Sequence, residues 1–292
     1  MKRKINIVLS LVVCTLSAAA QKLPNVQKES LRAPEGIKVD GKTAEWGNKF
    51  QAYNHATEVF YTISNDDDHL YLTLQATTPE IINKIIGGGI TFAVQKTGKK
   101  TDKDAMSITY PIFDRKDRPY LRNGAGGGMR RIQVIAGGGG DVQVFKSGGD
   151  DKPVKIQGDS AMRANNKRLS DNSKYIGVNG IKDLDSLISV YNTDGIKTAE
   201  AFDTQMAYTY ELSIDLKKLG LSANDGQKFA YHLTVNGSAP MMIRDVKIVG
   251  GGPAGGPPPP EVADMISKAN LSLGGASSAP TDFWGEYTLA KK

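Results

Sequence analysis

The stretch that decides the fold is Tyr208-Thr209-Tyr210-Glu211-Leu212-Ser213-Ile214-Asp215-Leu216. Every second residue in it is aromatic or aliphatic, and the residues between them are polar or charged. Successive side chains of a β-strand point to opposite faces, so this alternation predicts a strand with one buried face. The same period returns in residues 229–235, after a turn around 224–226. Two long alternating segments of this kind predict half-buried antiparallel strands.

Shorter segments nearer the N-terminus repeat the pattern. Alternation in residues 59–63 and 70–74, on either side of the polar turn Asn65-Asp66-Asp67-Asp68, predicts a hairpin. Residues 90–94 and 106–110 predict two further strands. This set of strands, with few helices, predicts an all-β fold, an antiparallel β-sandwich.

Two short helices are expected beside the strands. Thr78 and Pro79 suit the start of a helix that continues through Ile86, and Gly87 suits its end. A second helix is expected over 261–269, after the proline run 257–260.

The first twenty residues have the pattern of a secretory signal peptide. Lys2, Arg3 and Lys4 precede an apolar run, and small residues end at Ala20. We therefore expect cleavage near Ala20 and a periplasmic or secreted mature chain without a transmembrane span. The single cysteine, Cys14, leaves with this segment, so the mature chain has no disulfide and no zinc-thiolate site.

The rest of the chain is expected to form one domain. A linker over 21–34 precedes a single sandwich over 35–292, which carries an insertion at about 114–200 and a Gly/Pro-rich loop at 250–260. Residues 114–170 hold twelve Lys or Arg and six Asp. This basic stretch is either a solvated insertion or a surface that attracts an acidic glycan or lipid head group. The glycine clusters near it are either flexible connections or binding loops.

Composition and motifs exclude several function classes. The formal net charge of +6 falls to +3 without the leader, which gives no general case for nucleic acid or membrane binding. The segment Gly36-Ile37-Lys38-Val39-Asp40-Gly41-Lys42-Thr43 has the spacing of a phosphate-binding loop. We reject that function because no buried strand precedes it and no helical pattern follows it. Ile37 and Val39 are instead expected in a strand that leads to a turn at Asp40-Gly41.

No catalytic or metal-binding constellation is evident. The three histidines, His55, His69 and His232, are far apart, and His232 is expected to face outward from its strand. The cluster Asn65–Asp68 leaves calcium as the one possible cofactor, beside the simpler interpretation as a hairpin turn. The chain lacks a Gly-x-Ser-x-Gly nucleophile elbow, so we expect no enzyme.

Five residues are candidates for ligand binding. Trp46 and Trp284, the only tryptophans, stack on a sugar if they are exposed and pack the sandwich if they are buried. Tyr120, with Arg122 and Arg130 in the same basic stretch, is a candidate for an exposed stacking residue or for an anchor of that loop.

Several of these segments carry a family resemblance. Residues 37–46, 65–72, 89–94, 210–216 and 282–289 resemble, in this order, strands and turns of the carbohydrate-binding module family 9-like sandwiches and the related DOMON domains. The resemblance covers both ends of the chain but not residues 114–200. It implies an exported sandwich that binds carbohydrate between aromatic side chains, in some members with calcium.

Together these observations predict a noncatalytic, extracytoplasmic binding module for a carbohydrate or another envelope component. The alternative is a protein-interaction or structural envelope protein that displays its Gly-rich loops to a protein partner.

Overall fold

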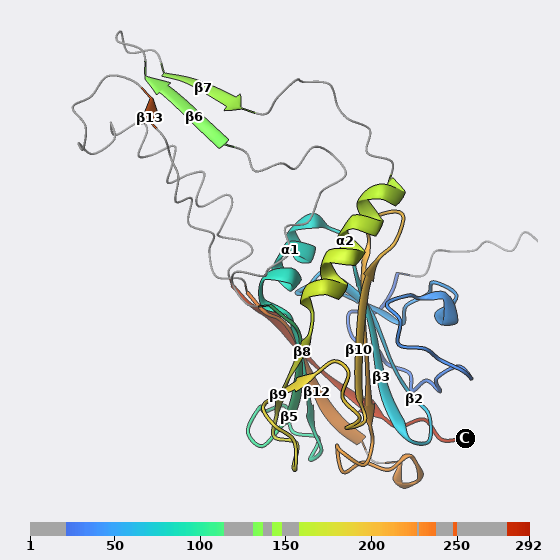
Figure 1. Cartoon of the computed structure of the whole chain (residues 1–292). Helices are drawn as coiled ribbons and strands as arrows, with labels where there is room; N and C mark the ends of the chain where they lie inside the picture. Colours follow the sequence, from blue (N-terminus) through green and yellow to red (C-terminus); the bar gives the residue numbers. More distant parts are fainter. Residues whose placement is uncertain are drawn as a thin grey trace, which may run out of the picture.

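A computed structural model describes residues 22–113, 131–136, 142–147, 158–226, 228–237, 248–249 and 279–292. Most of the regular structure is strand, arranged in two antiparallel sheets, and this confirms the predicted all-β, sandwich-like fold (Figure 1). The predicted signal peptide, the Gly/Pro-rich loop at 250–260 and the predicted helix over 261–269 lie outside the described residues. In the parts of the chain that are described, no helix is long and apolar enough to cross a membrane.

The first sheet has five strands in the order β1-β2-β3-β11-β10. Their bounds are β1 Ala52–Asn54, β2 Val59–Asn65, β3 His69–Ala76, β10 Ile196–Phe202 and β11 Tyr208–Asp215. The long alternating segment 208–216 forms β11, which pairs with β3 on one side and β10 on the other.

The second sheet has six strands in the order β14-β12-β4-β5-β8-β9. Their bounds are β4 Ile90–Gln95, β5 Met106–Ile112, β8 Tyr175–Asn179, β9 Leu187–Ser189, β12 Lys228–Val235 and β14 Thr281–Thr288. Thus β8, β9 and most of β10, which fall within the region expected as an insertion, belong to the two main sheets. A separate three-stranded sheet contains β6 Arg131–Ala136, β7 Val142–Ser147 and β13 Ile248–Val249.

Among the described residues, two α-helices accompany the sheets: α1 Pro79–Gly88 at one end of the sandwich and α2 Gly158–Asn172 alongside β10 (Figure 1). The predicted helix that begins after Thr78 is α1. It continues through Gly88, and its C-cap is Gly89, where φ is +78°, rather than Gly87. The Thr78 hydroxyl makes no capping hydrogen bond. The Asn166 amide of α2 bonds the backbone N–H and C=O of Phe202, so α2 satisfies polar groups of the edge strand β10.

Aromatic side chains fill the space between the sheets. Tyr61 of β2 and Tyr231 of β12 are fully buried, and their hydroxyls are 2.9 Å apart. The Phe283 ring lies 5.1 Å from the Tyr61 ring. Gly285 faces Tyr231 across the β12–β14 pair, and a Cβ atom there would collide with the tyrosine ring. The packing of the core therefore depends both on the large aromatic rings and on a glycine at position 285.

Several polar side chains on the outer face of the five-stranded sheet are buried. Thr62, Thr73 and Ser213 are each at most 4% exposed, and the N-terminal segment reaches this face where the Gln51 N–H donates to the Thr62 hydroxyl. Figure 1 shows this blue segment lying against β2 and β3. Glu211 fastens it, since one carboxylate oxygen accepts the backbone N–H groups of Asp40 and Gly41, both at 2.9 Å.

Residues 36–43, which have the spacing of a phosphate-binding loop, form the part of the N-terminal segment that contacts Glu211. The strand predicted at Ile37 and Val39 is wrong, because these residues form a bent loop between two glycines with positive φ. No α-helix follows Thr43, only a 3-10 turn at Ala44–Trp46. The second glycine, Gly41, lies so close to β10 that a Cβ atom would be 2.7 Å from the carbonyl carbon of Glu200.

Replacement of Gly41 tests this close approach. Gly41→Ala adds a clash to the cost of positive φ and displaces two donors from Glu211, so we expect a loss of about 3 kcal/mol in the free energy of unfolding. Gly36→Ala is the matched control, because Gly36 also has positive φ (+71°) but a methyl group there would meet no atom within 4 Å beyond its own chain neighbours. It should cost about 1 kcal/mol. Urea denaturation of both variants measures the difference, and equal losses would contradict the close contact.

Candidate functional site

The outer face of the six-stranded sheet carries an aromatic pair near one edge. Phe283 and Tyr287 of β14 point into the core, so Trp284 between them points outward. On β12, Tyr231 and Leu233 are buried, and His232 points outward as predicted from the sequence. The register pairs His232 with Trp284 directly across the two strands.

The two rings are stacked. Their centroids are 4.3 Å apart, and their planes differ by 12°. Both residues are partly buried, and the His232 side chain keeps 14% of its surface exposed. Because β14 is the edge strand of its sheet, no strand of the described chain covers the far side of the indole. The stack therefore fixes the orientation of the indole, and part of its surface is exposed.

Two aspartates hold the imidazole from either side. The connection between β4 and β5 brings Asp102 to 2.8 Å from Nδ1 of His232, and Gln95 pins this connection by donating to the carbonyl of Lys103. Asp282, two residues before Trp284, lies 3.1 Å from Nε2. That second contact has the distance of an ion pair but not the alignment of a hydrogen bond, so buried Nε2 has no hydrogen-bond partner among the described residues. Both carboxylates keep more than half of their surface exposed.

A row of hydroxyls continues from Asp282 across the sheet. The register aligns Asp282 with Thr234, Thr91 and Thr109 on successive strands, which are about 4.8 Å apart in such sheets. All three threonines are half-exposed, and the Thr91 and Thr109 hydroxyls bond each other at 2.8 Å. We call Trp284, His232, Asp102, Asp282 and this threonine row the Trp284 face. It offers a flat aromatic surface beside hydroxyl and carboxylate groups.

The other predicted ligand residues are elsewhere. Trp46 lies in the 3-10 turn of the N-terminal segment, and its indole N–H is buried without a hydrogen-bond partner in the described part of the chain. That segment covers the five-stranded sheet, so the structure does not bring Trp46 together with Trp284. Tyr120, Arg122 and Arg130 lie outside the described residues.

Sequence reasoning missed the contributions of Asp102 and Asp282 to this face. Asp282 and Trp284 share a strand face, and this could have been inferred from the sequence because alternate residues of a strand point the same way. The signal for Asp102 is absent from the local sequence, because only the fold brings the β4–β5 connection onto β12.

The Asn65–Asp68 cluster is a hairpin turn. Asp66 accepts hydrogen bonds from the backbone N–H groups of Asp68 and His69 and from the Tyr71 hydroxyl. Burial raises the pKa of Asp66, but these hydrogen bonds outweigh it and hold the pKa below its usual value. No group of three or more His, Cys, Asp or Glu side chains within the described residues is arranged to hold a metal ion.

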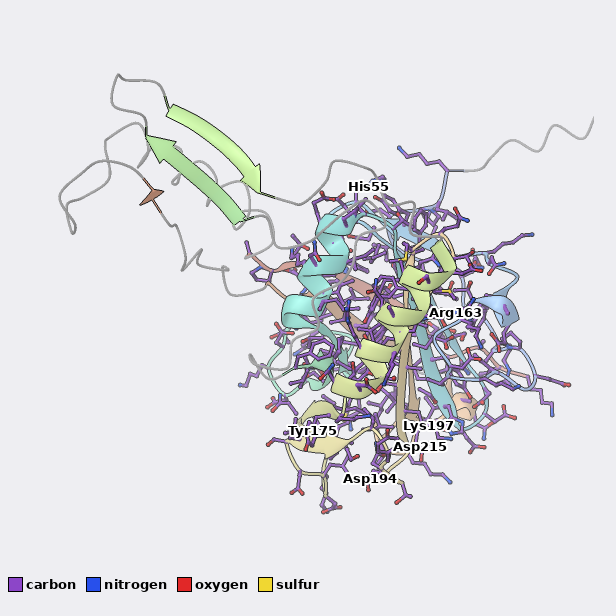
Figure 2. The ribbon with its side chains drawn as sticks, turned by 45° about the horizontal axis from the view of Figure 1, so that its top comes forward. His55, Arg163, Tyr175, Asp194, Lys197 and Asp215 are labelled. Atoms are coloured by element: carbon purple, nitrogen blue, oxygen red, sulfur yellow. The ribbon has the colours of Figure 1, made fainter. Side chains whose placement is uncertain are left out.

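An open hollow of about 330 Å³ lies near the β8–β9 and β9–β10 connections. Its lining residues are Asp183, Leu184, Asp185, Ile188 and Asp194. Figure 2 shows Asp194 near Asp215 and Lys197, at the end of the sandwich away from His55. The hollow has no aromatic lining residue, so it suits a sugar ring less well than the Trp284 face does.

Comparisons with known proteins add no family to these observations. No protein-family model matches the chain, and no curated protein is significantly similar to it.

Two carboxyl groups have the pKa of a general acid or base. Burial raises the pKa of Glu200 and of Glu211 to about 7, although hydrogen bonds to each carboxylate oppose the shift. Glu211 fastens the N-terminal loop. Glu200 points from β10 into the sandwich, where the hydroxyls of Ser173 and Tyr208 donate to it and Tyr110 lies at 3.5 Å. These contacts tie Glu200 to β5, β11 and the end of α2, so both carboxyl groups have structural roles.

The raised pKa values predict how stability depends on pH. Between about pH 4.5 and pH 7 the folded chain keeps protons on Glu200 and Glu211 that the unfolded chain releases. The free energy of unfolding therefore falls as pH rises through this window, by at most about 1.4 kcal/mol per pH unit for each group. Urea midpoints at pH 5, 6 and 7 measure the slope, which Glu200→Gln should flatten. Thr198→Val, which removes a neighbouring hydroxyl but no titrating group, should keep the slope of the unmutated chain. Equal slopes in the two variants would contradict the assignment of this pH dependence to Glu200.

Proposed function

We propose that this protein is a noncatalytic, extracytoplasmic binding module that holds a carbohydrate against the Trp284 face. One observation carries the proposal: a partly exposed indole is fixed in orientation by a stacked imidazole, which two aspartates hold in place. Aromatic rings offer large, rigid contact area, and little side-chain freedom remains to be lost when a ligand binds.

Polar groups beside the ring support the same ligand class. Asp282 lies on the same strand face as Trp284, and Thr234 lies directly across from Asp282. Carboxylate and hydroxyl oxygens accept hydrogen bonds from sugar hydroxyls, and the threonine hydroxyls also donate. The leader-like residues 1–20 support an extracytoplasmic location.

Thermal unfolding with polysaccharides tests the proposal. A ligand that binds only the folded state raises the melting temperature, so one or more members of a panel of neutral, amino and acidic polysaccharides should raise that of the mature chain, residues 21–292. Trp284→Ala should abolish the shift. The matched control Trp46→Phe should retain it and also leaves Trp284 as the sole tryptophan, whose fluorescence should then report binding. If no polysaccharide raises the melting temperature, the proposal is contradicted. The same measurements with a chelator show whether binding needs calcium.

A second candidate function, attachment to a partner protein, has support in a different surface. The exposed large hydrophobic side chains of the described residues are Tyr175, Leu187 and Tyr191, at 51%, 49% and 76% exposure. All three lie in or directly after the hairpin of β8 and β9. Exposed apolar side chains that gather in this way mark interaction surfaces more often than scattered ones do.

Pull-down from an envelope extract tests this second candidate. A partner that binds through this hairpin should be recovered with the mature chain and lost with Leu187→Asp, whereas Trp284→Ala should leave its recovery unchanged. Recovery of the same proteins by Leu187→Asp would contradict the role of the hairpin.

A further inference from the structure

Three carboxylates lie around Trp284 and His232, although the chain as a whole is basic. Asp282 and Glu286 flank Trp284 on the outer face of β14, and Asp102 lies on the other side of His232. All three side chains are more than one-third exposed. A ligand that contacts the indole therefore meets carboxylates on both sides of it along the strand.

These carboxylates differ in whether a cation already neutralises them. Glu286 forms an ion pair with Lys228 and has Lys100 at 4.0 Å. Asp102 and Asp282 have no Lys or Arg partner in the described chain, and the one basic side chain in contact with them is His232. Two exposed carboxylates beside the imidazole thus lack a permanently charged partner within the described residues.

We propose that the Trp284 face selects an amino glycan, a polysaccharide with free ammonium groups, over neutral and acidic polysaccharides. This inference rests on the carbohydrate function proposed above. An ammonium group on the sugar pairs with Asp282 and is attracted to the electron-rich face of the indole. An N-acetylated sugar keeps the stacking but leaves the aspartate without a counter-charge, and a uronic acid is repelled by it.

Oligosaccharides that differ only in this group test the inference. The probes are the hexamer of β-1,4-linked glucosamine, its fully N-acetylated form and a galacturonic acid hexamer, titrated into the mature chain at pH 6 and low salt. We expect the glucosamine hexamer to bind about fivefold to tenfold more tightly than the acetylated hexamer, as one exposed ion pair and one cation–π contact allow. Added salt should reduce this preference because exposed charges are screened.

Variants assign the preference to Asp282. Asp282→Asn should remove most of it and change the affinity for the acetylated hexamer by no more than about twofold. Asp185→Asn, an exposed carboxylate of the acidic hollow, is the matched control and should keep it. Trp284→Ala should lose both hexamers. Melting temperatures of the free variants show that each one is folded.

The outcomes separate the two proposals. Equal binding of the glucosamine and acetylated hexamers, or preference for galacturonic acid, would overturn the amino-glycan inference and leave the carbohydrate module in place. A preference that Asp282→Asn keeps would also overturn it. If no carbohydrate binds, including the neutral polysaccharides of the wider panel, both proposals fail.

Discussion

The carboxylate of Glu211 is the contact on which the arrangement of the five-stranded sheet depends. β11 is buried on both faces, so its alternating pattern does not mark a solvent-facing side. Glu211 would be an uncompensated buried charge without partners, and the amides of Asp40 and Gly41 supply them. The same two hydrogen bonds hold the N-terminal loop against the sheet beside Thr73, whose hydroxyl also contacts Glu211. A contact that satisfies one buried carboxylate therefore also covers part of a sheet face.

That closure makes the two outer faces of the sandwich unequal. The five-stranded sheet is covered by residues from its own N-terminus, and Trp46 is part of the cover. Among the described residues, the β4–β5 connection reaches part of the outer face of the six-stranded sheet, where Asp102 contacts His232. The threonine row and Trp284 are partly exposed on this face. The position of the candidate site follows from which sheet the N-terminal segment covers.

The period of two predicted most strands of the two sheets correctly, since one buried face forces polar and apolar residues to alternate. The pattern gave a wrong prediction, or none, where a segment's position is set by contacts with distant parts of the chain or where the element is short or polar. The strand expected at Ile37 and Val39 is a loop, because its position is set by Gly41 against β10 and by Glu211, far along the chain. β9 has three residues, too few for a period to appear, and α2 has a polar composition that does not stand out. A strand pattern also does not say which strands are neighbours. The pairing of β12 with β14, across a long stretch of chain, is what places the imidazole against the indole.

The candidate site shows the same limit. Trp284 was a candidate from its residue type alone, and its outward direction follows from its buried neighbours Phe283 and Gly285. The orientation of the indole is fixed by stacking on His232. The His232 ring is in turn held by a contact with Asp102, which comes from the β4–β5 connection. Net charge is misleading in the same way: the chain carries an excess of cations, yet Asp102 and Asp282, which contact the imidazole stacked on the indole, have no Lys or Arg partner among the described residues. Because exposed charges act over about 10 Å in ordinary salt, the groups within that distance decide which ligand is attracted. The charge of the preferred ligand therefore depends on which side chains the strand pairing brings to the Trp284 face. The net charge of the whole chain does not determine it.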